Sequence, residues 1–326
     1  MTQPLVRNTT IQPILSVQKE KAAGKGEDAA VCCIGGKRGI IASLDGCGGA
    51  GARKYQKADG WTGARIASFT CARVLAEWYQ QNRIDQLGLQ GYPCEKIRDS
   101  LAEAFRQKLA ERTAQTSDEA GGMISGGIVR SFPTTLAAIL LSEGEAAIRS
   151  LFLWAGDSRC YLLTEKGLRQ MTKDDLKRNV DPFDNLTKDA PMSNMIFAGD
   201  FRINCVEEWV KKPFVAITAT DGCFGYFSTP MAFESMLLET LQKANSPAAW
   251  EKAIDEEIGA VAGDDYTLQA VAVGFEDFAG LKRFYVPALN RYRQLFGKRL
   301  EAAAGQDDLR DIWNDYQREY LRSTQA

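Results

Sequence analysis

Acidic residues stand at the ends of apolar runs along most of this chain, and this pattern limits the possible folds more than any other feature. The five positions are Glu27-Asp28, Asp45-Gly46, Asp157, Asp221-Gly222 and Asp264-Asp265. Four of them lie at the end of a run typical of a buried strand, or beside one. A carboxylate at the mouth of a buried strand costs free energy unless positive charge compensates for it. We therefore expect the strands to converge on hard divalent cations bound by oxygen ligands.

The chain contains no histidine, and its formal net charge is −2. Zinc sites of the usual histidine type, Ser-His-Asp triads and histidine acid–base chemistry are therefore excluded. The sequence has no long basic or acidic block that would indicate binding to nucleic acid or to an anionic membrane surface. We expect neither nucleic acid nor a membrane as a partner.

The eight cysteines form no C-x-x-C pair, and several lie inside apolar runs. We interpret them as buried free thiols in a reducing compartment rather than as disulfides. The N-terminal residues lack the charged start and the apolar stretch of a signal peptide. No apolar run approaches the ~20 residues that a membrane-spanning helix needs. These features predict a soluble, cytoplasmic protein.

The order of periodic segments predicts an α+β fold. Residues 61–81 and 94–112 carry apolar residues at helical spacing, and residues 230–244 and 247–262 are rich in helix formers. The strand-like runs are 29–36, 38–44, 134–141, 146–156, 159–165, 214–220 and 266–275. Residues 1–27 are polar, and we expect a flexible approach to the first strand. Strands and helix pairs in this order are typical of helices packed on antiparallel sheets.

We expect residues 1–275 to form one domain, with residues 276–326 as a C-terminal helical extension. Residues 172–212 are irregular and charged, which predicts a long surface insert of the functional or mobile kind. Residues 281–326 mix aromatic and charged residues at helical spacing and predict one or two helices. These helices are expected either to pack on the same domain, which we favour, or to bind a partner.

Six short motifs give the chain a resemblance to a known family. In chain order they are GEDAAV, SLDGCGGAG, SFPTTLAAILL, LWAGDSRCYLL, ITATDGCF and AGDDYTLQAVAV, between about residues 20 and 275. No motif is specific alone, since an Asp-Gly dipeptide is a common turn. In this order the chain resembles a divergent, bacterial-type member of the metal-dependent serine/threonine protein phosphatases, the type 2C-like family. The resemblance implies a central sandwich of two antiparallel β-sheets flanked by paired helices, in four αββα layers.

The resemblance implies a role for each acid of the first two motifs. Asp45 would bridge two metal ions, with the Gly46 carbonyl as a neighbouring ligand. Glu27 would bind one ion largely through water, and Asp28 would be a further ligand or a supporting residue. The alternative for Asp45 is that it caps a tight turn.

The remaining acids complete the implied site. Asp221 and Asp264 would bind the other metal ion, and the family pattern favours Asp264 over Asp265 as the ligand. Asp157 would join Asp221 in holding a third, weaker ion. The expected cofactors are thus Mg²⁺ or Mn²⁺, as two ions or three. Arg159 is expected to form a structural ion pair rather than to contact substrate.

Such a site suits hydrolysis of a phosphomonoester. Two Mg²⁺ or Mn²⁺ ions roughly 3.5–4 Å apart lower the pKa of a bridging water and neutralise the phosphate oxygens. Gly48 and Gly49 would leave room for phosphate beside the backbone. The implied enzyme is a protein serine/threonine phosphatase of signalling, with a phosphorylated protein as substrate and a cognate kinase as a second partner. The insert at 172–212 lies where the family carries a substrate-facing flap.

Two departures from the family pattern affect the expected chemistry. Cys47 stands where the family usually has a histidine as general acid. A thiol with a pKa near 8.5 can donate a proton, so we keep Cys47 as a candidate catalytic residue. Ala23 stands where the family usually has an arginine that binds phosphate. Lys21 or Lys25 is a possible substitute, although lysine offers a point charge rather than a bidentate fork.

Two other functions stay open at this point. The first is a pseudophosphatase, a module that binds a phosphoprotein or a kinase through the same fold; the intact acids speak against it, and Cys47 and Ala23 speak for it. The second is a metal-dependent hydrolase of another phosphoester, such as a nucleotide.

Overall fold

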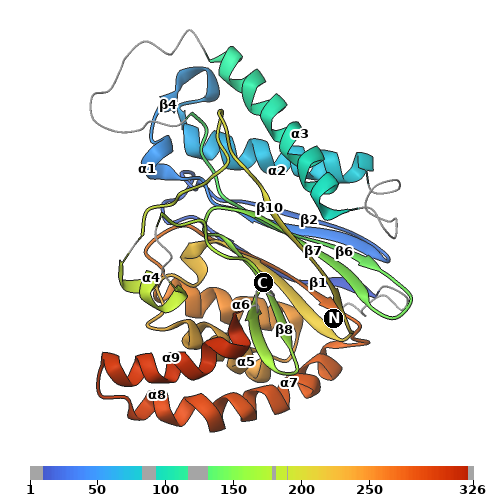
Figure 1. The fold of residues 1–326 in the computed structure, drawn as a ribbon, viewed down its shortest axis with the longest axis vertical. Helices are drawn as coiled ribbons and strands as arrows, with labels where there is room; N and C mark the ends of the chain where they lie inside the picture. The colour runs from blue at the N-terminus through green and yellow to red at the C-terminus, as the bar shows by residue number, and fades with distance from the viewer. Residues whose placement is uncertain (1–9, 83–92, 117–130, 178–180, 189, 322–326) are drawn as a thin grey trace.

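Two antiparallel β-sheets stacked face to face form the centre of the molecule, and helices cover both outer faces (Figure 1). The computed structural model describes residues 10–82, 93–116, 131–177, 181–188 and 190–321. The predicted α+β class with a central two-sheet sandwich between helical layers is confirmed.

Each of the two sheets has five strands. The first sheet, in spatial order, consists of β1 (Ile11–Lys19), β12 (Tyr266–Val273), β11 (Phe214–Ala219), β8 (Arg159–Thr164) and β9 (Gly167–Gln170). The second sheet consists of β10 (Asn204–Val210), β7 (Ile148–Ala155), β6 (Leu136–Glu143), β3 (Arg38–Leu44) and β2 (Ala29–Gly35). A small two-stranded sheet pairs β4 (Lys54–Tyr55) with β5 (Trp61–Thr62).

The central strands are buried on both faces, which explains their continuous apolar sequences. Every residue of β7, β11 and β12 is buried. One face of each sheet packs against the other sheet, through residues such as Ile139, Phe152, Leu162 and Val271. The opposite faces pack against helices, so neither side of a central strand meets water. Alternation of polar and apolar residues is therefore absent from these strands.

Two helical layers enclose the sandwich. The second sheet is covered by α2 (Gly63–Asn82) and α3 (Cys94–Gln115), above the sheets in Figure 1. The first sheet is covered by α5 (Pro230–Lys243), α6 (Pro247–Gly259), α7 (Phe278–Tyr292) and α9 (Gln306–Tyr320). Shorter helical segments are α1 (Gly48–Gly51), η1 (Gln56–Ala58), α4 (Pro182–Lys188), η3 (Asp221–Cys223), the π-helix η4 (Arg293–Gly297) and α8 (Lys298–Ala302). Among the helices described, none is long and apolar enough to span a bilayer.

The expectation of a flexible segment over residues 1–27 is wrong for residues 11–19, because these form β1. Residues 1–9 lie outside the described part of the chain. β1 pairs with β12, and its register shifts between Pro13 and Leu15. Such an irregularity interrupts the period of two that marks a strand in a sequence. Both Ile14 and Leu15 are consequently buried, and the segment has no simple alternation.

The expectation that residues 172–212 form an irregular insert is wrong for residues 204–210, which form the edge strand β10 beside β7. Its charged residues are paired within the sheet region: Glu207 accepts two hydrogen bonds from Arg149, and Glu208 pairs with Arg169. The charges that suggested a loop are therefore compatible with an edge strand. Within the insert, residues 178–180 and 189 lie outside the described residues.

The C-terminal helices pack on the first sheet and share its apolar core. Trp313 is fully buried, and Tyr285 donates a hydrogen bond of 2.6 Å to the Leu163 carbonyl of β8. Tyr316 of α9 donates a hydrogen bond to the buried carboxylate of Glu234 in α5. Burial raises the pKa of Glu234 to about 7, although the bonds from Tyr316 and from the Leu168 backbone partly oppose this rise.

We expect Glu234 to make the stability of the protein depend on pH. The folded protein holds this proton up to about pH 7, whereas the unfolded chain loses it near pH 4.5. Stability should therefore fall as pH rises through this window, by roughly 3 kcal/mol from this group. In urea unfolding, Glu234→Gln should lose roughly 2 kcal/mol less than the parent between pH 5 and pH 8. The exposed Glu257→Gln serves as a control, and equal pH dependence in all three proteins would contradict the expectation.

Candidate metal centre

The topology brings the predicted acids to one end of the sandwich. Asp28 precedes β2 and Asp45 follows β3, and these two strands pair with Ala29 opposite Leu44. Asp221 follows β11 and Asp264 lies just before β12, and these strands also pair at that end, with Ala219 opposite Leu268. Asp157 lies in the turn by which the chain passes from β7 in one sheet to β8 in the other.

The main chain of Asp45 is held by the two threonines of the SFPTT motif. Thr135 N–H donates to the Asp45 carbonyl at 2.7 Å, and Thr134 Oγ1 donates to the same carbonyl at 2.8 Å. Asp45 N–H donates to Thr135 Oγ1 at 3.0 Å. The Thr135 hydroxyl also bonds the hydroxyl of Ser158 at 2.6 Å, which ties the Asp45 loop to the Asp157 turn. These hydrogen bonds hold the backbone of Asp45 in place and do not involve its carboxylate.

The turn that carries Asp157 depends on Gly156, whose φ is +93°. A Cβ at this position would lie 2.8 Å from the Thr135 side chain. Glycine therefore permits both the backbone conformation and the close approach of the two loops.

Asp28 is the most deeply buried of these acids, with 4% of its surface exposed. Thr220 Oγ1 donates to Asp28 Oδ2 at 2.9 Å, and Thr267 N–H donates to Thr220 Oγ1 at 2.9 Å. A single hydroxyl thus connects Asp28 to the segments that carry Asp221 and Asp264.

Glu27 and Asp265 are joined through the backbone. The Asp265 carboxylate accepts hydrogen bonds of 2.7 Å from Glu27 N–H and from Lys21 N–H. Asp265 therefore has a structural task, whereas the neighbouring Asp264 is exposed and accepts only the N–H of Asp265 among the bonds described for its side chain. The choice of Asp264 over Asp265 as a metal ligand stays a prediction.

The carboxylate of Glu27 accepts a hydrogen bond from Thr62 Oγ1. Thr62 belongs to β5 and lies outside every motif, so the sequence offered no signal for it. A Cβ at Gly48 would lie 2.4 Å from Glu27 Oε2, so Gly48 leaves room for this carboxylate rather than for phosphate. Gly49 faces open space, as the predicted phosphate approach requires.

The acids raise one another's pKa. Burial is the largest cause for Asp45, whose pKa is raised well above its usual value, and the charges of Asp221, Asp28 and Asp157 add to it. Burial and neighbouring acids also raise the pKa of Asp28 to about 7 and that of Asp221 to about 6. The pKa of Asp157 is raised by burial first and then by Asp221. Such a cluster of mutually repelling carboxylates is stabilised by cations.

Two buried carboxylate oxygens of this cluster show whether its residues fit a cation. Asp28 Oδ1 and Asp157 Oδ1 are buried, and neither has a hydrogen-bond partner among the described residues. Buried polar atoms without a partner are rare and costly. Oxygen donors of this kind are the ligands that Mg²⁺ and Mn²⁺ prefer, so the residues present fit these ions.

The carboxylate oxygens of the acidic cluster lie too far apart to form one closed coordination sphere without rearrangement. In the described part of the chain, the only set of three ligand-type side chains with all donor atoms within 4.8 Å of one another is Cys94, Glu95 and Cys205. The site acids thus share one end of the sandwich without forming a compact three-carboxylate cage.

Cys47 is buried, with 8% of its surface exposed, and it directly precedes α1. Its N–H donates to the Pro133 carbonyl at 3.1 Å, and its thiol lies 3.9 Å from the Asp45 carbonyl oxygen. The thiol is therefore adjacent to the loop that carries the candidate bridging acid.

The expectation that Arg159 is structural is confirmed. Its guanidinium binds both carboxylate oxygens of Asp174, the closest at 2.7 Å, and lies 4.1 Å from the ring centre of Phe224. Arg159 is also buried, with 2% exposed. This arginine lowers the pKa of Asp157 and Asp221, but burial and the other acids outweigh it.

Arg65 was not predicted from the sequence, and it is the arginine that lies beside Glu27. Its Nη1 donates to the Gly24 carbonyl at 2.7 Å, next to Ala23, and its guanidinium lies 4.4 Å from the ring centre of Trp61. Its positive charge lowers the pKa of Glu27, although burial of Glu27 outweighs this effect. Arg65 Nε is buried and has no hydrogen-bond partner among the described atoms.

The two-sheet sandwich with a cluster of carboxylates at one end is the fold expected of a metal-dependent phosphatase. The profile of the family described as "Protein phosphatase 2C" matches residues 21–257. The chain therefore belongs to the protein phosphatase 2C family, and the expected enzyme class, protein serine/threonine phosphatase, is confirmed. Divalent metal use of the Mg²⁺ or Mn²⁺ type follows for the family.

Solved structures show the same fold. The Mycobacterium tuberculosis serine/threonine phosphatase PstP/Ppp is 17% identical, with a TM-score of 0.56 over 81% of this chain and 99% of that chain. Staphylococcus aureus Stp1 is 14% identical, with a TM-score of 0.58 over 84% and 97%. The PstP catalytic domain in complex with two manganese ions is 17% identical, with a TM-score of 0.54 over 81% and 99%. No curated protein matches the chain.

Proposed function

We propose that this phosphatase hydrolyses phosphoserine and phosphothreonine in proteins at a binuclear Mg²⁺ or Mn²⁺ centre. Asp45 would hold both ions, with the Gly46 carbonyl as a neighbouring ligand and with Glu27 and Asp28 on one side. Asp221 and Asp264 would complete the other side, and Asp157 with Asp221 would hold a third ion. The observation that carries the proposal is the shared end of the sandwich, where acids from separate strands raise one another's pKa.

Divalent ions held by these residues would supply a nucleophile at neutral pH, by lowering the pKa of water, and would neutralise the phosphate oxygens. The chain's own residues position this chemistry. Thr134 and Thr135 fix the Asp45 backbone, and Thr220 orients Asp28 through one oxygen, leaving Asp28 Oδ1 without a hydrogen bond. The direct test is hydrolysis of p-nitrophenyl phosphate with Mn²⁺, and its loss in EDTA.

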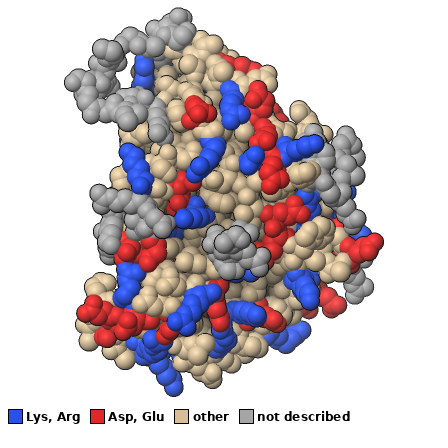
Figure 2. Space-filling view, viewed as in Figure 1, with Lys and Arg blue, Asp and Glu red and all other residues tan. Residues whose placement is uncertain are grey.

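The substrate class is testable with a panel of phosphopeptides and nucleotides. Basic and acidic side chains alternate on the face seen in Figure 2, and no continuous basic groove crosses the described residues there. Because the chain belongs to a protein phosphatase family, we propose phosphoproteins as substrates, with a cognate serine/threonine kinase as the enzyme that phosphorylates them. Faster turnover of nucleotides than of every phosphopeptide would contradict this assignment.

We propose that Arg65 binds the substrate phosphate in place of the arginine missing at position 23. Its guanidinium lies at Gly24, next to position 23, and its positive charge acts on Glu27. Arg65→Ala should lower kcat/KM for a phosphopeptide roughly 10–100-fold, mainly through KM, because a charged hydrogen bond contributes about 1.5–3 kcal/mol. Arg65→Lys should recover only part, since lysine lacks the bidentate fork.

Steady-state kinetics with a phosphoserine peptide measure these effects, and circular dichroism checks the fold, because Arg65 also stacks on Trp61. The exposed Lys25→Ala is the matched control from the same segment. If Lys25→Ala raises KM and Arg65→Ala does not, the phosphate is bound by the lysine instead.

Cys47→His is expected to raise activity on phosphoserine peptides more than on aryl phosphates. An imidazole is a better proton donor near neutral pH than a thiol, and aryl leaving groups need little protonation. A several-fold gain in the ratio of the two kcat values is the expected result. Equal or lower rates on both substrates would show that Cys47 does not occupy an acid position.

The pseudophosphatase alternative has a simple test. Absence of turnover with Mn²⁺ on every phosphopeptide, together with binding of the same peptides in calorimetry, would favour a binding module. Turnover that is lost in Asp221→Ala supports the enzyme.

A further inference from the structure

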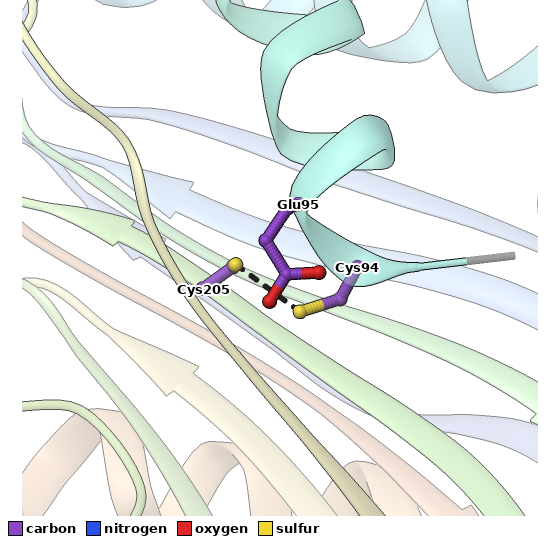
Figure 3. Close-up of side chains that lie close together, drawn as sticks. All are labelled: Cys94, Glu95 and Cys205. Atoms are coloured by element: carbon purple, nitrogen blue, oxygen red, sulfur yellow. Dashed lines mark hydrogen bonds between the residues drawn. The ribbon is translucent and has the colours of Figure 1, made fainter.

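Two cysteine sulfurs meet where the start of α3 lies against β10 (Figure 3). Cys94 is the first residue of α3, and Cys205 lies in the edge strand β10, 111 positions later. The Cys94 thiol donates to Cys205 Sγ at 3.1 Å. A disulfide has an S–S distance of about 2.05 Å, so a movement of about 1 Å separates this contact from a covalent bond.

The surroundings of Cys205 give a small oxidant access to its sulfur. Cys205 is half-buried and lines a groove of about 440 Å³ together with Arg98, Arg106, Arg202 and one acid, Asp99, which pairs with Arg98 at 2.8 Å. Arg98 Nη1 lies 3.9 Å from Cys205 Sγ. Reactive cysteines typically occupy partly exposed, electropositive surroundings of this kind. Cys94 is less accessible, with 7% of its surface exposed.

A metal ion is the alternative occupant, because Glu95 brings a carboxylate oxygen within 4.8 Å of both sulfurs. The geometry favours a disulfide instead. Zinc–sulfur bonds of about 2.3 Å in a tetrahedral site hold two sulfurs roughly 3.8 Å apart. The observed 3.1 Å is shorter than that separation.

We propose that Cys94 and Cys205 form a reversible disulfide when hydrogen peroxide oxidises the protein. The Cys205 thiolate attacks one peroxide oxygen, the O–O bond breaks, and the leaving hydroxide takes a proton to become water. The Cys205 sulfenic acid is then attacked by the Cys94 sulfur, which loses its proton. The S–S bond forms, the S–O bond breaks, and a second water leaves. One molecule of hydrogen peroxide is thus reduced for each pair of thiols oxidised, and a dithiol reductant reverses the bond.

The disulfide would attach the start of α3 to the edge of the second sheet. Because it joins residues 111 positions apart, it restricts the unfolded chain strongly. We expect the oxidised protein to unfold at a Tm about 5 °C higher than the reduced protein. The free thiols of the structure then correspond to the reduced state.

The test uses the full chain, treated with a small molar excess of hydrogen peroxide, alkylated under denaturing conditions and digested without reductant. Mass spectrometry should identify the peptide containing Cys94 linked to the peptide containing Cys205 as the dominant crosslink. Both thiols should be lost together and should return with dithiothreitol. Cys205→Ser should abolish the crosslink and the rise in Tm, and Cys94→Ser should leave Cys205 as a trappable sulfenic acid.

The exposed Cys32→Ser is the matched control, and it should keep the crosslink. Cys205 is only half-buried, so its serine variant remains informative if Cys94→Ser fails to fold. Oxidation of Cys205 to sulfinic acid without a crosslink overturns the proposal. So does a dominant crosslink between Cys32 and Cys33. Zinc retained at one ion per reduced chain and lost in Cys205→Ser assigns the pair to a metal site instead.

Discussion

Asp45→Asn is expected to lower Mn²⁺-dependent turnover of a phosphoserine peptide by roughly 1000-fold or more. The substitution keeps the shape of the side chain but removes the charge at the position proposed to bridge two ions. Metal-assisted stabilisation of the transition state contributes several kcal/mol, and each 1.36 kcal/mol is a factor of ten in rate. Steady-state kinetics with saturating Mn²⁺ measure the loss.

Loss of activity through unfolding is distinguishable from loss of the metal. Burial and the neighbouring acids raise the pKa of Asp45 well above its usual value, so its ionised form destabilises the metal-free protein at pH 8. Asp45→Asn without metal should therefore unfold at the same temperature as the parent or at a higher one. The exposed Asp307→Asn in α9 should change neither property. Retention of more than about a tenth of the parent activity by Asp45→Asn would contradict the proposed centre.

Mn²⁺ is expected to stabilise the protein strongly at pH 8 and weakly at pH 5.5. The folded protein keeps protons on Asp28 up to about pH 7 and on Asp221 up to about pH 6, above the ordinary value of 3.8. In the absence of metal, stability should consequently fall as pH rises through this range. A cation competes with these protons, so it binds better once they have been lost.

Thermal unfolding at the two pH values, with Mn²⁺ and with EDTA, measures this dependence. At Mn²⁺ of 100 times Kd the gain is about 2.7 kcal/mol, or roughly 4 °C in Tm for a chain of this size. Asp221→Asn should reduce the gain at pH 8 and flatten the fall in EDTA. An equal Mn²⁺ effect at both pH values, or in both proteins, would contradict metal binding by these acids.

Prediction from sequence succeeded for elements whose signal lies within a short stretch of the chain, such as helical periodicity or a glycine turn. The helices 63–82 and 94–115 and the hairpin of β2 and β3 follow from periodicity and from a glycine turn. It failed for β1, because the register shift after Pro13 removes the alternation, and for β10, whose charges are compensated by Arg149 and Arg169. Each of these two strands depends on residues that are distant in the sequence: β1 pairs with β12, and the charges of β10 pair with Arg149 and Arg169.

The candidate site shows the same division. The acids stand out because a carboxylate beside a buried strand is costly in free energy, so Asp45 and Asp221 were identifiable from their positions alone. Thr62 and Arg65 were not, since each acts on Glu27 only after the chain has folded. The tasks of Asp264 and Asp265 also became distinct only when the backbone bonds of Asp265 were located.

The sequence by itself determined the fold class, the family and the acids proposed as metal ligands, because these depend on residue type, spacing and order. The tertiary structure decided which groups surround those acids, in which direction the pKa of Asp28, Asp45, Asp157 and Asp221 changes, and which cysteines lie in contact. Electrostatic and contact energies depend on distance in space, and residues more than a hundred positions apart, such as Cys94 and Cys205, become neighbours only through the pairing of strands and the packing of helices.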